Sequence, residues 1–330
     1  MPLSHLEILL RQNKKSLVLP EGADPRTWKA IDHLLQEDLV AKIWVLGNAD
    51  EVRRLQGQSR SPNDSRVFLA CDRISDISLQ TRAELIHHAE SRGKTLDQDV
   101  AANLAEHPLY QGAWLVKAGH ADAGLAGAVY STAEVIRAGL AVIGLQEGIR
   151  SISSSFLMHR PGSHPLLWLY TDCGVIIEPT AEQLADTAAT SLETWKRISK
   201  DEPIVAFLSY STKGSAKHAS QAKVVSGFEI FRERYPDVLA DGELQFDAAF
   251  DATVGLRKAP GSKVAGRANI FVFPNLDAGN IAYKITQRLG GFEAWGPLLQ
   301  GFRKPWSDLS RGASPADIAA CAVINLSKSF

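Results

Sequence analysis

The chain has 330 residues, 45% of them hydrophobic and 22% charged, with a formal net charge of −1. This composition excludes a largely disordered chain, and the near-zero charge argues against a dedicated nucleic-acid-binding protein. Three separated cysteines without a Cys-x-x-Cys pair exclude a zinc ribbon and fit a reducing compartment. Because neither a signal peptide nor an apolar run of about 20 residues occurs, we expect a cytoplasmic protein without membrane contact.

The first part of the chain alternates strand and helix patterns. Residues 16–20 and 41–47 are short apolar runs typical of buried strands, and Asp24-Pro25 between them is typical of a helix start. This β-α-β unit predicts a parallel pair of strands, and residues 66–70 predict a third strand. Residues 79–104 predict helices.

The rest of the chain continues the alternation. Ser131 and Glu134 form the pattern of a capping box that opens a helix. No internal repeat or low-complexity linker marks a domain boundary, and the pattern as a whole predicts the α/β class. The further predicted strands are residues 151–158, 166–170, 174–177, 203–209 and 268–274, and the further predicted helices are residues 180–198, 278–289 and 314–326.

Residues 209–218 are a candidate anion site. They join the clearest predicted strand to a helix and contain Ser211, Thr212, Lys213 and Gly214. Hydroxyls, lysines and backbone N–H groups at a helix start suit a phosphate, although a polar loop with a helix cap explains the same residues. Walker, dinucleotide-binding, zinc-protease and nucleophile-elbow motifs are absent. His87 and His88 are interpreted as a solvated helix face.

Residues 308–317 form a second candidate. Ser314, Pro315 and Asp317 have the pattern of a helix start, but that pattern leaves Ser310 and Arg311 unexplained. A guanidinium fork just before a helix suits a tetrahedral phosphate.

Three weaker candidates keep alternative interpretations. Residues 273–284 are either a ligand site at a strand end or a helix capped by Asp277, and the small residues 124–132 allow either a ligand or close packing. Carboxylates alternate over residues 241–247, where solvated strand-edge charges are favoured over a divalent-metal site.

Taken in order, these segments resemble the phosphate acetyltransferase (phosphotransacetylase) family. The resemblance runs from residue 17 to the C-terminal helix. Its most specific blocks are residues 211–218, 241–249, 258–262, 278–281, 287–291 and 308–312.

The resemblance implies a reversible reaction of acetate metabolism in which acetyl-CoA and phosphate give acetyl phosphate and CoA. It implies a two-domain, parallel-sheet α/β fold similar to the isocitrate and isopropylmalate dehydrogenases. One domain would comprise residues 1–138 and 297–330, the other residues 139–296, with the active site in the cleft between them. A homodimer is implied, and neither a metal nor an organic cofactor is needed besides the substrate CoA.

The family's catalytic positions correspond to Ser310, Arg311 and Asp317. Asp317 would accept the proton of the CoA thiol, whose ordinary pKa is about 8.5. The thiolate would then attack acetyl phosphate in a ternary complex, with Arg311 on the phosphate and Ser310 on the developing oxyanion. A helix N-terminus weakens a carboxylate as a base, so burial in the closed cleft would have to compensate. The resemblance also assigns substrate binding to Ser131, Thr132, Ser211, Thr212, Lys213, Gly214, Asn280, Tyr283 and Arg288.

Two departures from the family pattern concern charge. Where family members often carry Arg-Lys before a glycine, this chain has Ala89-Glu90. Arg92, Lys94 or Arg137 would then have to supply the cation for CoA or phosphate, and Arg92 and Arg137 are the predicted CoA ligands. The usual Asp-Leu-Asn motif reads Asn275-Leu276-Asp277 here.

Three other functions stay open from the sequence. Pocket shape would decide between acetyl groups and the longer acyl groups of the butyryltransferases. A sensor that binds acetyl phosphate without turnover is favoured by Ala89 and opposed by the retained Ser310, Arg311 and Asp317. An oxidative decarboxylase of the related fold would need a metal, for which Asp247 and Asp251 are the candidate acids.

Overall fold

Two β-sheets organise the chain, each in its own unit. The computed structural model describes residues 3–163 and 165–330; Met1 and Pro2, with which the first predicted domain begins, lie outside the described residues. Unit 1 extends to Glu147 and resumes at Phe302, and unit 2 is Gly148–Gly301. Both changes of unit come later in the chain than the predicted boundaries at residues 138 and 296. No helix within the described ranges is long and apolar enough to cross a membrane.

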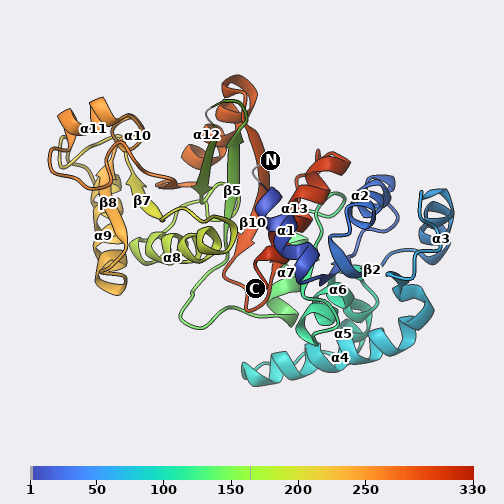
Figure 1. Ribbon diagram of the computed structural model, residues 1–330. Coiled ribbons are helices and arrows are strands. Elements are labelled where there is room, and N and C mark those ends of the chain that lie inside the picture. Colours follow the sequence, from blue (N-terminus) through green and yellow to red (C-terminus); the bar gives the residue numbers. More distant parts are fainter. Residues whose placement is uncertain (1–2, 164) are drawn as a thin grey trace. The chain divides into compact units, whose positions relative to one another are not determined.

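The sheet of unit 1 is entirely parallel, in the strand order β11-β4-β1-β2-β3. Consecutive side chains of a strand point to opposite faces, and Leu17, Val18 and Leu19 of β1 are all buried, so both faces of this sheet are covered. Helix α13 contacts both α1 and α2, and α4, α5, α6 and α7 form another contacting group (Figure 1). The bounds in unit 1 are α1 (Ser4–Gln12), β1 (Lys15–Leu19), α2 (Pro25–Gln36), β2 (Val40–Val45), α3 (Ala49–Gln58), β3 (Val67–Leu69), α4 (Ile74–Ser91), α5 (Gln98–Ala105), α6 (Pro108–Lys117), β4 (Ala123–Leu125), α7 (Thr132–Val142), β11 (Trp306–Ser307) and α13 (Pro315–Ser327).

The sheet of unit 2 is mixed, which corrects the expectation of parallel sheets throughout. Its order is β10-β5-β6-β9-β7-β8. Strands β10, β5 and β6 pair antiparallel, whereas β6, β9, β7 and β8 pair parallel. The bounds in unit 2 are β5 (Ser153–Arg160), β6 (Leu166–Thr171), α8 (Ala181–Ile198), β7 (Ile204–Leu208), α9 (Ala219–Arg234), β8 (Leu239–Leu244), α10 (Phe246–Phe250), α11 (Ala252–Lys258), β9 (Ile270–Val272), α12 (Leu276–Gly290) and β10 (Glu293–Gln300).

Several helix starts lie where the sequence predicts them. Asp24 caps α2, and capping boxes open α7 at Ser131 and α13 at Ser314. The cap of α12 is Asn275, whose side chain accepts a hydrogen bond from the N–H of Ala278, so the interpretation of Asp277 as the cap is wrong. Asn precedes the first helical residue here, which is the position where a side-chain oxygen reaches the free N–H groups.

Residues 174–177 form bends rather than the extended segment that their composition predicts. The buried carboxylate of Asp172 accepts hydrogen bonds from the N–H groups of Gly174, Val175 and Ile176. In a strand, these N–H groups would donate to a neighbouring strand. Here they donate to Asp172, so the segment bends around this carboxylate.

Candidate functional site

The predicted catalytic residues of unit 1 lie in one loop and the first helical turn behind it. Ser310 and Arg311 are exposed and Asp317 is half-buried. In the capping box of α13, Asp317 Oδ2 accepts hydrogen bonds from Ser314 N at 2.9 Å and Ser314 Oγ at 2.7 Å. One carboxylate oxygen of Asp317 therefore serves the helix start, and Oδ1 is the oxygen at which it would accept a proton.

The loop begins at the end of β11, beside β4. Trp306 and Ser307 pair with Gly124 and Leu125. The next residue, Asp308, is fully buried, and Thr132 Oγ1 donates a hydrogen bond of 2.5 Å to its Oδ2. No described residue hydrogen-bonds the buried Oδ1 of Asp308. Burial raises the pKa of this carboxyl to about 7.

The predicted substrate residues Ser131 and Thr132 lie next to this loop, but their hydroxyls already have partners. Ser131 Oγ donates to Glu134 Oε2 at 2.6 Å as part of the capping box of α7, and the Thr132 hydroxyl is bound to Asp308. The structure thus brings Ser131, Thr132 and the loop of Ser310 together within unit 1. Ser131 caps α7, and the Thr132 hydroxyl links the first turn of α7 to Asp308.

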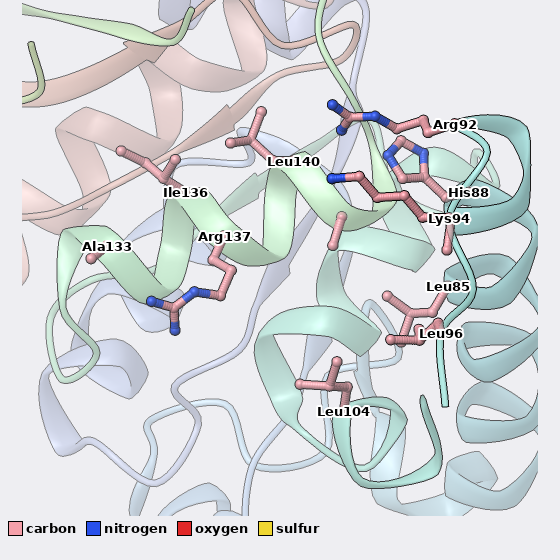
Figure 2. Close-up of a pocket in the computed structure, with 12 residues that line it drawn as sticks. Leu85, His88, Arg92, Lys94, Leu96, Leu104, Ala133, Ile136, Arg137 and Leu140 are labelled. Atoms are coloured by element: carbon pink, nitrogen blue, oxygen red, sulfur yellow. The ribbon is translucent and has the colours of Figure 1, made fainter. Parts of the chain in front are cut away.

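A cavity of about 620 Å³ in unit 1 contains the predicted CoA residues Arg92 and Arg137 (Figure 2). Arg137 extends from α7, and Arg92 and Lys94 come from the segment that follows α4. Ala89, which replaces the family's arginine, lines the same cavity. Its walls are apolar and come from α4, α5, α7 and the segment after α4: Leu85, Leu96, Leu104, Ile136 and Leu140.

The charge of this cavity is positive. Among the described residues no carboxylate pairs with Arg92, Lys94 or Arg137, and the nearby Glu84 is bound to Lys117. His88 lines the cavity and its Nε2 is buried without a described hydrogen-bond partner, so its interpretation as part of a solvated face is wrong. Burial, followed by the charge of Lys117, lowers the pKa of His88. The apolar walls and His88 escaped the sequence analysis because they meet only through the packing of three helices.

In the candidate anion loop of unit 2, residues 209–218, hydrogen-bond donors bind side chains of the same unit. Ser211 Oγ donates to Glu243 Oε1 at 2.7 Å, and the N–H of Gly214 donates to the same oxygen at 2.8 Å. Thr212 Oγ1 donates to Gln245 Oε1 at 3.2 Å. A carboxylate of β8 thus occupies the donors that a phosphate would use.

The acids of β8 are neither solvated nor grouped as a metal site. Asp241 is 8% exposed and Glu243 is 3% exposed, so the predicted solvated strand edge is wrong for both. Asp241 forms an ion pair with Lys213 and accepts a hydrogen bond of 2.5 Å from Ser262 Oγ.

The two acids considered as metal ligands have other partners. Asp247 pairs with Lys258 at 2.7 Å, and Asp251 caps α11 by accepting a hydrogen bond from the N–H of Val254. Each carboxylate thus has a local structural contact that explains its position.

The predicted substrate residues of α12 have mixed surroundings. Asn280 Nδ2 donates to the carbonyl of Cys173 at 3.1 Å, and the ring of Tyr283 stacks on Phe156 with centroids 3.9 Å apart. Both side chains therefore help to pack α12 against β5 and the segment after β6, within unit 2. Arg288, in the last turn of α12, is exposed.

The comparisons with known proteins agree on one family. The model of the family described as "Phosphate acetyl/butaryl transferase" matches residues 3–326. A phosphate acetyltransferase from Acetivibrio thermocellus is 39% identical over 329 residues, which cover 98% of this chain and 97% of that protein. The crystal structure of a phosphotransacetylase from Streptococcus pyogenes matches with a TM-score of 0.90 and 38% identity, covering 99% of this chain and 98% of that one. A 4-hydroxythreonine-4-phosphate dehydrogenase from Klebsiella pneumoniae, 11% identical with a TM-score of 0.51 over 96% of this chain and 100% of that one, shares the fold alone.

Proposed function

This chain belongs to the phosphate acetyl/butaryl transferase family, and we propose that it transfers an acetyl group reversibly between CoA and phosphate. The observation that carries this proposal is the match to a phosphate acetyltransferase over 98% of the chain. Ser310 and Arg311 lie in the loop before α13 and Asp317 lies in the first turn of this helix, which supports their proposed roles as oxyanion donor, phosphate ligand and base, respectively.

The proposed chemistry follows from these three side chains. Asp317 accepts the thiol proton of CoA at Oδ1, because the capping box occupies Oδ2. The thiolate attacks the carbonyl carbon of acetyl phosphate, the new C–S bond forms, and the C–O bond to phosphate breaks. Arg311 holds the leaving phosphate and Ser310 donates to the oxyanion of the tetrahedral intermediate. The proton on Asp317 then passes to phosphate.

We propose that the cavity of Arg92, Lys94 and Arg137 binds CoA. CoA combines phosphate groups with a long, partly apolar chain, and the cavity combines three cations with leucine and isoleucine walls. Because Ala89 lines the same space, the neighbouring cations can supply the charge that the family's arginine provides elsewhere.

We propose that Arg311, rather than the loop of unit 2, is the principal phosphate ligand. The donors of Ser211, Lys213 and Gly214 are bound to Glu243 and Asp241, whereas Arg311 is exposed. Substrate contacts of Ser131, Thr132, Ser211, Thr212, Lys213, Gly214, Asn280, Tyr283 and Arg288 stay predictions that binding measurements on variants can test.

The reaction needs neither a metal nor an organic cofactor, since the acyl phosphate and the thioester are both already activated. We further propose a cytoplasmic location, the two-domain fold of the isocitrate and isopropylmalate dehydrogenases, and a homodimer. An exposed apolar row on α12 supports the homodimer: Ile281, Ile285 and Leu289 repeat every four residues and are 57%, 54% and 84% exposed. Light scattering of the chain and of Leu289→Glu tests it.

The test of the activity is phosphate-dependent release of CoA thiol from acetyl-CoA, measured with a thiol reagent beside butyryl-CoA. We expect faster release from acetyl-CoA, loss of release in Arg311→Ala, and normal release in Arg54→Ala, whose side chain is a surface partner of Glu51. Faster release from butyryl-CoA would assign the longer acyl group. No release from either substrate would favour a binding protein without turnover.

A further inference from the structure

Arg26 in the first turn of α2 has every N–H of its guanidinium bound. Its Nε and one terminal nitrogen donate to the carboxylate of Asp24, the cap of the same helix, at 2.6–3.1 Å. Burial alone would raise the pKa of Asp24, but the hydrogen bonds and the charge of Arg26 together hold it below its usual value. The carboxylate therefore stays charged and fixes the plane of the guanidinium.

The remaining donors of Arg26 reach two loops far away in the sequence. The terminal nitrogen Nη1, which does not contact Asp24, donates to the carbonyls of Arg311 at 2.8 Å and Ala313 at 3.1 Å. The terminal nitrogen Nη2, which also binds Asp24, donates to the carbonyl of Ala128 at 2.8 Å. A single side chain thus joins the loop before α13 to the loop before α7, and its bond to Arg311 is to the backbone of that residue.

Glu21 binds the loop before α7 through the N–H groups of that loop, whereas Arg26 binds one of its carbonyls. Its buried carboxylate accepts hydrogen bonds of 2.9 Å from the consecutive N–H groups of residues 127–130. The N–H groups of this loop are bound by Glu21 and its Ala128 carbonyl by Arg26. Because the loop before α7 is held in this way, it forms a rigid support to which Arg26 ties the carbonyls of Arg311 and Ala313.

We propose that Arg26 is a positioning residue that sets the loop of Ser310 and Arg311 for the proposed acetyl transfer; this inference rests on the proposed function. The fork of the guanidinium is the reason that arginine stands here. Its planar donors serve a carboxylate on one side and three carbonyls on the other, which the single ammonium of lysine cannot do.

The same unit offers a matched control in Arg66. Its backbone N–H and Nε donate to Asp64 Oδ1 at 2.9 and 3.0 Å, and a terminal nitrogen donates to Asp64 Oδ2 at 2.8 Å, which repeats the Asp-x-Arg arrangement of Asp24 and Arg26. Its other partners are Asp38 and the carbonyl of Leu35. The side chains of Arg26 and Arg66 are 29% and 27% exposed, so their truncation removes similar contacts.

The experiment compares Arg26→Ala, Arg26→Lys and Arg66→Ala by steady-state kinetics, thermal unfolding and hydrogen exchange. At a temperature where all variants are folded, we expect kcat to fall about 10- to 100-fold in both Arg26 variants, the range expected for misplaced reacting groups. The KM for acetyl-CoA should stay near the wild-type value, and guanidinium ions at low millimolar concentration should partly restore kcat in Arg26→Ala. Arg66→Ala should keep its kcat even where its Tm falls equally.

Hydrogen exchange separates failure of the inference from failure of the proposed function. Backbone amides of residues 309–314 should exchange faster in both Arg26 variants and not in Arg66→Ala. Unchanged kcat in Arg26→Lys, an equal loss of kcat in Arg66→Ala, or unchanged exchange of residues 309–314 each overturns the inference. An inactive wild type with selectively faster exchange in the Arg26 variants rejects the acetyl transfer and retains the positioning of the loop.

Discussion

Two connections from a strand to a helix, one in each unit, carry the hydroxyl and cationic side chains expected of an anion site. In unit 2, the donors of Ser211 and Gly214 are bound to Glu243 of the neighbouring strand β8. In unit 1, the buried carboxylate of Glu21 binds backbone N–H groups of the neighbouring loop before α7, and Arg311 in the connection from β11 to α13 is left exposed. Buried acids lie close to both connections, but only in unit 2 do these acids bind the hydroxyl and the lysine of the connection itself.

Loop composition alone does not tell whether the hydroxyl and cationic donors of a loop are left for a ligand. In these two loops the difference lies in the adjacent strand, which in unit 2 supplies carboxylates that bind the donors. β8 supplies two, Asp241 and Glu243, and both are buried. Within unit 1 the acids hold the scaffold, so the cation that the loop presents is available to a substrate.

The largest expected effect is on phosphate kinetics, and it distinguishes the loop of Arg311 from the loop of Lys213. Arg311→Ala should lower kcat/KM for phosphate at least about 100-fold at an unchanged Tm, because a charged, preorganised donor is removed from the transition state. Lys213→Ala should lower the Tm, since it leaves Asp241 without its cation, and should affect phosphate kinetics far less. The comparison is broken if Lys213→Ala abolishes phosphate dependence at an unchanged Tm.

The next effect concerns the stability that Glu243 gives to unit 2. Burial would raise the pKa of Glu243, but hydrogen bonds from Gly214 and Ser211 hold it below the usual 4.5. Its contribution is therefore complete above about pH 4.5 and disappears as the pH falls through the lower, folded pKa. Glu243→Gln should lower the free energy of unfolding by about 1–3 kcal/mol at pH 7 and by less at pH 4. Urea unfolding at both pH values measures it; an equal difference at both would exclude a charged Glu243 as the cause.

Asp308 should give the opposite pH dependence in unit 1. Because burial raises its pKa from 3.8 to about 7, the folded state holds its proton more tightly and stability falls as the pH rises through that interval. Asp308→Asn removes the titration and should flatten the curve by up to about 1.4 kcal/mol per pH unit. Unfolding free energies between pH 4 and pH 8 check the slope, with Asp76→Asn, whose side chain is 71% exposed, as a surface control. A variant with the wild-type slope contradicts the assignment to Asp308.

The smallest effect lies in the cavity of unit 1. Arg137→Ala should raise the KM for acetyl-CoA about tenfold, because one charge-assisted hydrogen bond to a phosphate is worth about 1.5 kcal/mol at the lower end of its range. kcat at saturation should stay near wild type, since the cavity binds substrate and transition state alike. Steady-state kinetics with acetyl-CoA and with a truncated acetyl pantetheine analogue, which lacks the nucleotide phosphates, makes the comparison. An equal KM increase for both compounds would place Arg137 away from the phosphates.

The parts of the fold that the sequence predicts well are those that depend on local chemistry. Ser131, Ser314 and Asp24 cap their helices as expected because the cap and the N–H groups that it binds are within three residues. β7 and the last three residues of β1 are continuous apolar runs, because each of these strands is covered on both faces of its own sheet.

The parts that the sequence does not predict depend on partners far along the chain. β10 has no counterpart among the predicted strands, because it includes Gly296 and Pro297 and the register is interrupted between Trp295 and Leu298. The burial of Glu243 requires the loop of β7, and the cavity requires three helices. The sequence shows Asp24 only as the start of a helix and gives no role to Arg26. The Asp-x-Arg pattern was the signal that could have indicated their ion pair.

The place of β11 has a consequence for synthesis of the protein on the ribosome. The buried Trp306 of β11 extends the sheet of unit 1 beside β4, and α13 contacts α2, β1 and β4. Unit 2 is one continuous segment, whereas unit 1 takes its last strand and helix from the end of the chain. During translation, unit 2 can fold as soon as it emerges, while the five-stranded sheet of unit 1 waits for the final residues. A released chain that ends at Gly301 would therefore contain all of unit 2, behind an N-terminal half whose strand β4 lacks its neighbour β11 and is exposed to chaperones and proteases.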